Sequence, residues 1–224
     1  MGMPLSIYAG PTALARIREQ GLTPALFSHV LGASGGPKWF VLAGIDRILF
    51  PAFFAESSQP VNVIGSSAGA FRSACFVQRD PVAAINRLAE NYSQTVYSPK
   101  PGPGEITHKA RELIDYVMGR NGVMEVLTNR RFKLHVIAAR CHGLMQHYGR
   151  YRQMLGLGVS AAANTMNRRL LKKLYTRSVF SAPDSELQIN DPYQLNTEFI
   201  ELGFNNVKDA LLASGSIPLV IDGV

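Results

Sequence analysis

Two apolar segments of this chain each run directly into a glycine-rich turn, and each turn is followed by helical spacing of apolar residues. The first segment, residues 25–31, enters a turn at residues 32–36, and the second, residues 61–64, enters a turn at residues 65–69. Alternation of strand, turn and helix is typical of an α/β sheet protein. We therefore expect two parallel strands that lie close together and present both turns at the same edge of the sheet.

The second turn reads GSSAG, a G-x-S-x-G sequence between a predicted strand and a predicted helix over residues 68–77. A serine at a sharp strand-to-helix turn needs very small residues two positions away on either side, because a Cβ atom there would collide. Gly65 and Gly69 meet that demand. The helix that begins at Ala68 directs its positive end towards negative charge at the turn. Ser67 is therefore the candidate nucleophile, and the alternative is that GSSAG is only a tight structural turn.

The first turn, GASGGPKW over residues 32–39, has the residues of an anion-binding cradle. Adjacent glycines let backbone N–H groups approach an oxyanion closely, although a purely structural turn is the alternative. A P-loop has glycine directly before its lysine and Ser or Thr after it, but Pro37 precedes Lys38 and Trp39 follows. A dinucleotide-binding fold needs G-x-G-x-x-G and an acid at the end of its second strand, and neither is present. Both nucleotide-binding motifs are thus excluded.

The two turns together are more specific than either alone, because acyl transfer requires a hydroxyl beside free N–H donors. GASGGPKW, GSSAG about thirty residues later and the late segment LLASGSIP resemble the patatin-like phospholipase family. The resemblance covers residues 25–80 and, more weakly, residues 205–224. It departs from the family pattern at Ser34, where many members have glycine, and at Trp39, where many have a small residue.

This resemblance implies a three-layer α/β/α sandwich around a mostly parallel sheet, formed by residues 1–224 as one domain. It implies a lipase-like or phospholipase-like hydrolase that cleaves acyl esters of lipids through an acyl-Ser67 intermediate, with a Ser-Asp dyad and without a metal or organic cofactor. The expected oxyanion and substrate-binding residues are Ser34, Gly35, Gly36, Lys38 and Ala68.

The family places its catalytic Asp in a D-G-G or D-G-A turn, and the match in this chain is Asp222, followed by Gly223 and Val224. Only three residues separate Asp222 from Pro218, fewer than the family usually has there. We therefore expect the natural chain to continue past Val224 to such a turn.

Three alternatives stay open from the residues. The first is a triad of Ser67, Asp115 and His142. The second is a lipid-binding or interaction module that lacks its base, and the third is a phosphate-binding protein that uses the glycine turn without covalent chemistry.

The net charge of +7 is unevenly distributed along the chain. Residues 109–177 contain fourteen Lys or Arg and three acids, whereas residues 178–224 contain one lysine and seven acids. The chain lacks the aromatic motifs and reading helices of nucleic-acid-binding proteins, so an anionic lipid surface is the expected partner rather than a nucleic acid. The candidates for peripheral membrane contact are Arg168, Arg169, Lys172 and Lys173.

These four cations lie in NRRLLKKLYTR, residues 167–177, which has an apolar stripe at helical spacing. The alternative is an ordinary core stripe beneath a solvated basic face. No apolar run approaches the ~20 residues needed to span a bilayer, and the first residues lack the pattern of a secretory signal. We therefore expect a cytoplasmic protein. Cys75 and Cys141 lack the spacing of a zinc site.

Overall fold

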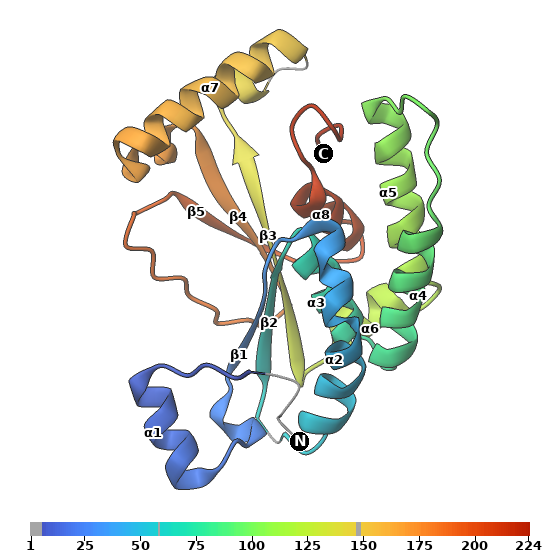
Figure 1. Ribbon diagram of the computed structural model, residues 1–224, viewed down its shortest axis with the longest axis vertical. Coiled ribbons are helices and arrows are strands. Elements are labelled where there is room, and N and C mark those ends of the chain that lie inside the picture. The colour runs from blue at the N-terminus through green and yellow to red at the C-terminus, as the bar shows by residue number, and fades with distance from the viewer. Residues whose placement is uncertain (1–5, 58, 147–148) are drawn as a thin grey trace.

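The computed structural model of the protein describes residues 6–57, 59–146 and 149–224. Over these residues the chain forms an α/β fold around a five-stranded sheet of order β1-β2-β3-β4-β5 (Figure 1). Three of its four strand pairs are parallel, and β3 and β4 are antiparallel. The predicted mostly parallel sheet is confirmed. The strands are β1 (His29–Gly32), β2 (Val61–Ser66), β3 (Phe132–Cys141), β4 (Tyr175–Ser181) and β5 (Thr197–Glu201).

The two predicted strands are neighbours, with Gly32 of β1 beside Gly65 of β2. Strand β2 lies between β1 and β3, which explains why its first half is rich in β-branched apolar residues. Val61 and Val63 are completely buried. Because β1, β2 and β3 are parallel, the turns that follow β1 and β2 meet at one edge of the sheet, as the sequence predicted.

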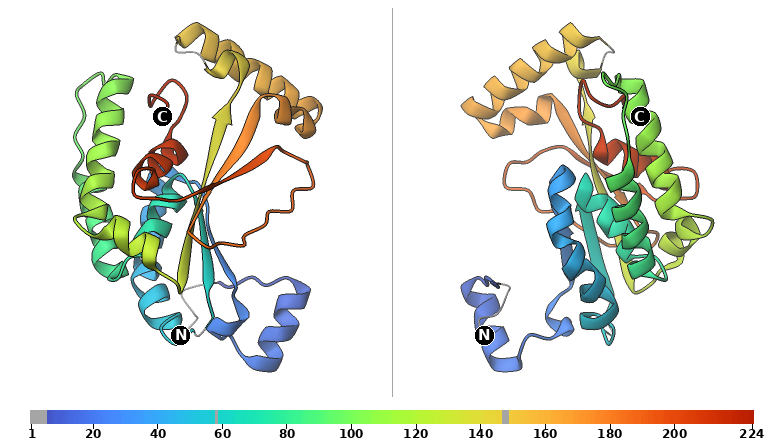
Figure 2. Two further views of the ribbon diagram at one scale, coloured as in Figure 1. Left: turned by 180° about the vertical axis from the view of Figure 1, so that it is seen from behind. Right: turned by 45° about the vertical axis from the view of Figure 1, so that its right-hand side comes forward.

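The helices lie on both sides of the sheet, but unequally (Figures 1 and 2). Helices α3 and α8 pack directly on one face, and α4 and α5 pack against them. Helices α1 and α7 lie on the other side, at opposite ends (Figure 2). This arrangement is consistent with three layers. The helices are α1 (Pro11–Gln20), α2 (Ala43–Ile48), α3 (Ala68–Phe76), α4 (Pro81–Gln94), α5 (Pro103–Met118), α6 (Gly122–Thr128), α7 (Arg150–Met166) and α8 (Val207–Gly215).

A buried ion pair fastens α2 to α3. Asp46 is completely buried, and Arg72 donates to both of its carboxylate oxygens, at 2.7 Å and 2.5 Å. A buried carboxylate without such donors would strongly destabilise the fold, because it would have lost its hydration without replacement. Next to this pair, Phe50 stacks on Phe76 with ring centroids 4.1 Å apart.

The apolar residues that follow the first glycine turn have helical spacing over residues 39–50, but this segment forms three short pieces: η2 (Gly36–Leu42), α2 and η3 (Leu49–Phe53). A proline such as Pro51 often ends a helix, but η3 runs past it. Its wider π-helical turn lets the Phe54 N–H donate to the Leu49 carbonyl at 3.0 Å, so the chain keeps turning across the proline.

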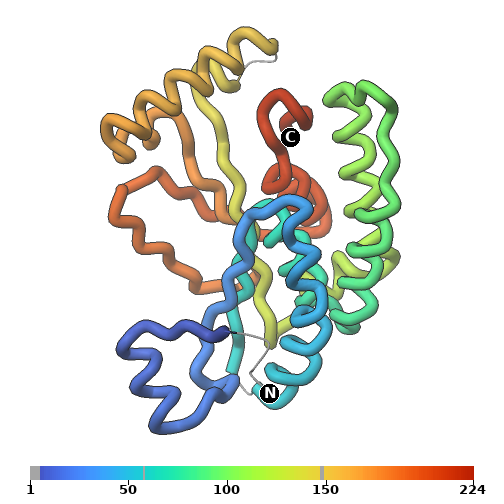
Figure 3. Tube along the Cα trace, viewed as in Figure 1, coloured from blue at the N-terminus to red at the C-terminus, as the bar shows by residue number. Residues whose placement is uncertain are grey.

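The basic segment at residues 167–177 is not one helix. It forms the 3₁₀ turn η5 (Arg168–Lys173), and β4 begins at Tyr175. Residues such as Tyr175 and Thr176 suit a strand, and pairing with β3 overrides the local helical spacing. Residues 182–196, which connect β4 to β5, bow away from the sheet (Figure 3). This connection is anchored where Lys133 Nζ donates to the Asp184 carbonyl at 2.7 Å.

Candidate active site

Ser67 stands between the last residue of β2 and the first residue of α3. Its backbone has φ 54° and ψ −127°, a combination that costs a residue with a side chain about 1–3 kcal/mol. The carbonyl of Ser67 accepts from the N–H groups of Ala70 and Phe71, at 2.8 Å and 3.2 Å, so the helix starts without any intervening loop. The turn predicted from GSSAG is present, and it holds this serine in a strained conformation.

Three glycines allow β1 and α3 to approach closely enough to hold this turn. A Cβ atom on Gly69 would lie 2.0 Å from the Gly32 carbonyl oxygen, and one on Gly65 would lie 2.5 Å from the Ala70 Cα. The predicted demand for glycine two positions from Ser67 on either side is therefore met for a steric reason. Gly32 adds a further close contact, since its own Cβ would lie 2.8 Å from the Gly69 carbonyl oxygen.

The turn after β1 and the start of α3 carry free N–H donors. Within the described residues, the N–H groups of Gly35, Gly36 and Ala68 form no hydrogen bond. A Cβ on Gly35 or Gly36 would meet nothing within 4 Å, and Gly36 has φ 50°. Gly36 and Ala68 line one cavity with Ser67, so their N–H groups can approach a negatively charged oxygen placed beside the serine, whereas Gly35 lies in the same turn but does not line this cavity.

Ser34 and Lys38 occupy different positions from the free donors. The Ser34 hydroxyl donates to the carbonyl and the hydroxyl oxygens of Ser66, at 3.3 Å and 3.1 Å, and so ties the glycine turn to the end of β2. Lys38 is exposed on the first turn of η2. Neither residue lines the cavity beside Ser67. Ser34 therefore positions the turn in this structure.

The cavity beside Ser67 has a volume of about 340 Å³ and walls that are mainly apolar. Trp39 forms part of it, is 4% exposed, and meets the Tyr92 ring edge to face with centroids 6.1 Å apart. Such a cavity suits the hydrocarbon part of an acyl group, because it removes apolar surface from water. The other main apolar contributors are Phe71, Leu88, Leu113, Leu212 and Ile221.

Ser214, which sequence reasoning did not single out, holds the turn from the side of α8. The Ser67 N–H donates to Ser214 Oγ at 2.8 Å, and that hydroxyl donates to the Ile137 carbonyl at 2.6 Å. The hydroxyl thus links α3, α8 and β3 at one point. Ser214 belongs to LLASGSIP, so the resemblance marked the segment, but no local pattern shows which of its residues reaches Ser67.

Asp222 lies against the start of α5. Its N–H donates to Thr107 Oγ1 at 2.9 Å, and its carboxylate lies 3.9 Å from the place that a Cβ on Gly104 would occupy. In the part of the chain that the structure describes, the Ser67 hydroxyl has no hydrogen-bond partner. Neither a carboxylate nor an imidazole is therefore held against it here.

The alternative triad is not assembled. Asp115 accepts from Lys208 Nζ at 2.7 Å, and a ring nitrogen of His142 lies 2.8 Å from Thr176 Oγ1. Both groups are thus engaged with other partners. His147, which follows them in the chain, lies outside the described residues.

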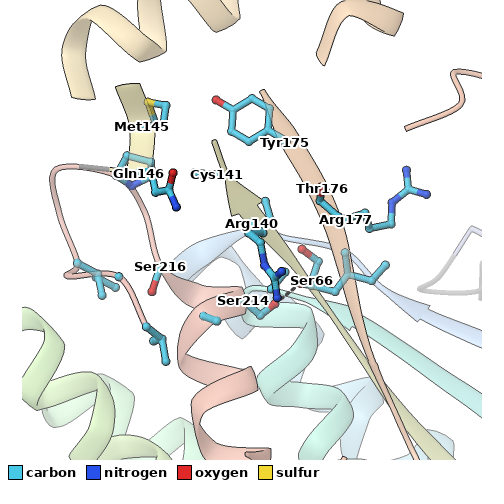
Figure 4. A pocket seen from close by; sticks show the side chains of 18 of the residues that line it. Ser66, Arg140, Cys141, Met145, Gln146, Tyr175, Thr176, Arg177, Ser214 and Ser216 are labelled. Atoms are coloured by element: carbon cyan, nitrogen blue, oxygen red, sulfur yellow. Dashed lines mark hydrogen bonds between the residues drawn. The ribbon is translucent and has the colours of Figure 1, made fainter. Parts of the chain in front are cut away.

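A second and larger cavity, of about 830 Å³, lies on the side of β3 and β4 (Figure 4). Ser66, Arg140 and Ser214 lie close together on one side of it, and Tyr175 lies opposite. Its two arginines are already neutralised, because Arg140 pairs with Glu198 at 3.0 Å and Arg177 pairs with Asp191 at 2.5 Å. Ser67 does not line this cavity, so we place the candidate active site at the smaller one.

In the part of the chain that the structure describes, neither the thiols nor the potential metal ligands form a competing site. Burial raises the pKa of both thiols, Cys75 and Cys141, and so keeps them protonated. Across residues 6–57, 59–146 and 149–224, no three His, Cys, Asp or Glu side chains gather where they could hold a metal ion. Within the same ranges, none of the helices has the length and apolar character needed to cross a bilayer.

Comparison of this chain with models of known protein families, with curated proteins and with solved structures finds no match.

Proposed function

We propose that this chain is a serine acyl hydrolase of the patatin-like kind, with Ser67 as its nucleophile. The observation that carries the proposal is the strained backbone of Ser67, held beside free N–H donors and an apolar cavity. Such strain persists only where the surrounding structure imposes it, and it occurs preferentially at functional sites. A turn that only connects a strand to a helix does not require a serine in this strained backbone conformation.

The proposed reaction uses two steps. The Ser67 Oγ attacks the ester carbonyl carbon, its proton passes to a base, and the carbonyl electron pair moves onto oxygen. The N–H groups of Gly35, Gly36 and Ala68 donate to that oxyanion, an interaction that favours the transition state over the bound ester. The tetrahedral intermediate then expels the alcohol, which takes up the proton. Water attacks the acyl-Ser67 ester in the same way and releases the carboxylic acid.

The base of this reaction is proposed from the resemblance alone. In a Ser-Asp dyad, a carboxylate takes the serine proton directly, which requires hydrogen-bond reach. Asp222 is the candidate in this chain, and in this structure its N–H and carboxylate contact the start of α5. A substitution at Asp222 therefore decides whether the residue acts as the base.

The unpartnered Ser67 hydroxyl favours a second candidate function: a catalytically silent module that binds acyl chains in the same cavity. Both candidates use the apolar cavity, but only the hydrolase needs an activated serine. They differ in their reaction with a fluorophosphonate, which forms a covalent bond with an activated serine and not with an inert one.

Labelling with a fluorophosphonate, together with hydrolysis of a short p-nitrophenyl ester, tests the proposal. We expect one labelled serine, Ser67, and loss of labelling and hydrolysis in Ser67→Ala, with a fall of at least about 10³-fold. Ser66→Ala is the matched control, because it removes the neighbouring hydroxyl but keeps the Ser66 carbonyl that accepts from Ser34, and it should keep the labelling and most of the hydrolysis. Labelling at Ser66, or unchanged hydrolysis in Ser67→Ala, would contradict the assignment. Fatty-acid binding without labelling would support the silent module, and binding of inorganic phosphate alone would support the phosphate-binding alternative.

A further inference from the structure

Helix α7 (Arg150–Met166) turns its polar and small residues towards the protein. The Gln153 side chain accepts from the Leu219 N–H at 3.2 Å, and the Ser160 hydroxyl shares a hydrogen bond of 2.7 Å with the Tyr175 hydroxyl. Between them Gly156, the one buried residue of α7, packs against Met145, to which a Cβ would come within 2.7 Å. These three residues are spaced by three and four positions, so they define the inner face of the helix.

The opposite side of the helix carries its large apolar side chains. We call it the outer face of α7 and define it by Tyr151, Met154, Leu155, Val159 and Met166, which are 84%, 51%, 64%, 50% and 81% exposed. An ordinary surface helix has the reverse arrangement, with an apolar stripe towards the core and polar residues in water. Contiguous exposed apolar surface of this kind marks a contact with another apolar body.

Exposed positive charges flank this face. Residues 126–183 contain eleven Lys or Arg and no Asp or Glu. Six of these cations are exposed at the two ends of α7 and in η5, and none forms an ion pair with a described residue. They are Arg150, Arg152, Arg168, Arg169, Lys172 and Lys173.

We propose that the outer face of α7 docks on an anionic lipid surface. The helix lies in the plane of the membrane, its apolar side chains enter the boundary between headgroups and acyl chains, and the cations contact lipid phosphates. Charge complementarity selects this partner, because an apolar face with cations at both ends and no acid matches a bilayer that is apolar within and negative at its surface. A tyrosine near one end also suits the interfacial region.

The apolar residues of the proposed membrane contact lie in α7 and not within residues 167–177, where the sequence predicted the candidate contact. Leu170, Leu171 and Leu174 are half-buried, so the stripe predicted within residues 167–177 packs partly on the protein and leaves its lysines and arginines exposed. The apolar part of the docking surface is α7. This helix follows β3 and lies at the carboxyl end of the parallel strands β1, β2 and β3 (Figure 1). Ser67 follows β2 at the same end. Docking therefore brings this end of the molecule to the lipid.

Cosedimentation of the full chain with vesicles tests the proposal. We compare phosphatidylcholine vesicles with vesicles that also contain phosphatidylglycerol, at low and at physiological salt. We expect binding to the anionic vesicles that weakens with salt, because exposed charges are screened over roughly 8 Å at physiological ionic strength. Leu155→Gln should lower the partition coefficient at least about tenfold, because the leucine side chain would no longer be transferred from water into the bilayer.

Ile48→Gln is the matched control, because Ile48 is 63% exposed at the end of α2, against 64% for Leu155, and it should bind like the wild type. Replacing Lys172 and Lys173 by Gln should weaken anionic binding about fivefold for each charge and reduce its salt dependence. Ser67→Ala should bind normally, so the result is independent of the proposed hydrolase activity.

Three results would overturn the proposal. One is wild-type vesicle binding by Leu155→Gln. Another is equal binding to neutral and anionic vesicles at every salt concentration. The third is a dimer in sedimentation experiments that Leu155→Gln dissociates, without any vesicle binding by either form, since the outer face would then be an interface between two copies of the chain.

Discussion

The turn at Ser67 and helix α7 use small residues for opposite purposes. At the turn, glycines bring backbone against backbone so closely that no methyl group fits, and this contact holds one strained conformation. In α7, Gly158 and the neighbouring alanines meet little of the protein, and the large side chains face outwards. The first region therefore derives its stability from internal packing, whereas the second exposes apolar surface that only another body can cover.

Alanine substitutions at Gly69 and at Gly158 should have opposite effects on the free energy of unfolding, and the effect at Gly69 should be the largest. Gly69→Ala should cost more than about 4 kcal/mol or prevent folding, because its Cβ would lie 2.0 Å from a backbone oxygen of β1. Gly158→Ala should instead raise stability by about 0.5–1 kcal/mol, because alanine favours the helix and meets nothing within 4 Å. Urea unfolding followed through the single tryptophan, Trp39, measures both. A Gly69→Ala protein within about 1 kcal/mol of the wild type would refute the steric account of the turn.

Acid should weaken the sheet through His135 of β3. Burial, with smaller effects from His29 and Lys133, lowers the pKa of His135 from 6.5 to about 4. Between these values the unfolded chain binds the proton and the folded chain does not, so stability is fully present above pH 6.5 and falls by ~3 kcal/mol as the pH drops towards 4. Helix α7 contains no His, Asp or Glu, so this effect of acid is expected in the sheet and not in that helix.

Comparison of His135→Gln with His108→Gln isolates this effect. His108 is exposed on α5, where its ring lies 3.3 Å from Glu112, and replacing a member of such an exposed pair should change the free energy of unfolding by less than about 1 kcal/mol. His135→Gln should remove about 2–3 kcal/mol of the difference in unfolding free energy between pH 7 and pH 4.5. Identical pH dependence in the two variants would show that His135 is not held neutral in the fold.

The smallest effect is expected at Asp222. Because its carboxylate lies at α5 and not at Ser67, Asp222→Asn should change ester hydrolysis and fluorophosphonate labelling less than about twofold. Stability should stay within about 0.5 kcal/mol, as is usual for an exposed residue. Loss of hydrolysis in a variant that remains folded would show that Asp222 reaches Ser67 during the reaction and serves as its base.

Much of the fold around Ser67 could be predicted because its causes are local. Apolar runs mark β1 and β2, and Asp80 caps α4 by accepting from the Ala83 N–H at 2.9 Å, as its place before Pro81 indicates. Strands β4 and β5 were not predicted. Strand β5 is a five-residue edge strand with glutamates at two positions, and β4 follows a segment with helical spacing. Pairing with β3 and with each other establishes these strands, and that pairing is not visible along the chain.

The glycine spacing around Ser67 indicates a tight turn, because the exclusion of a Cβ at Gly65 acts against Ala70, close by in the chain. At Gly69 the exclusion acts against Gly32, which only the position of β1 beside the turn brings close. Local sequence does not specify the role of Ser214, because this residue lies 147 positions from Ser67 in the chain. The Ser214 hydroxyl accepts from the Ser67 N–H only because α8 packs on the sheet. Local sequence also does not specify which face of α7 points towards the protein. Helical periodicity divides Gln153 and Ser160 from Tyr151 and Leu155, but which side faces water depends on where the rest of the protein lies. The tertiary structure places the polar side inwards and leaves the apolar side outside.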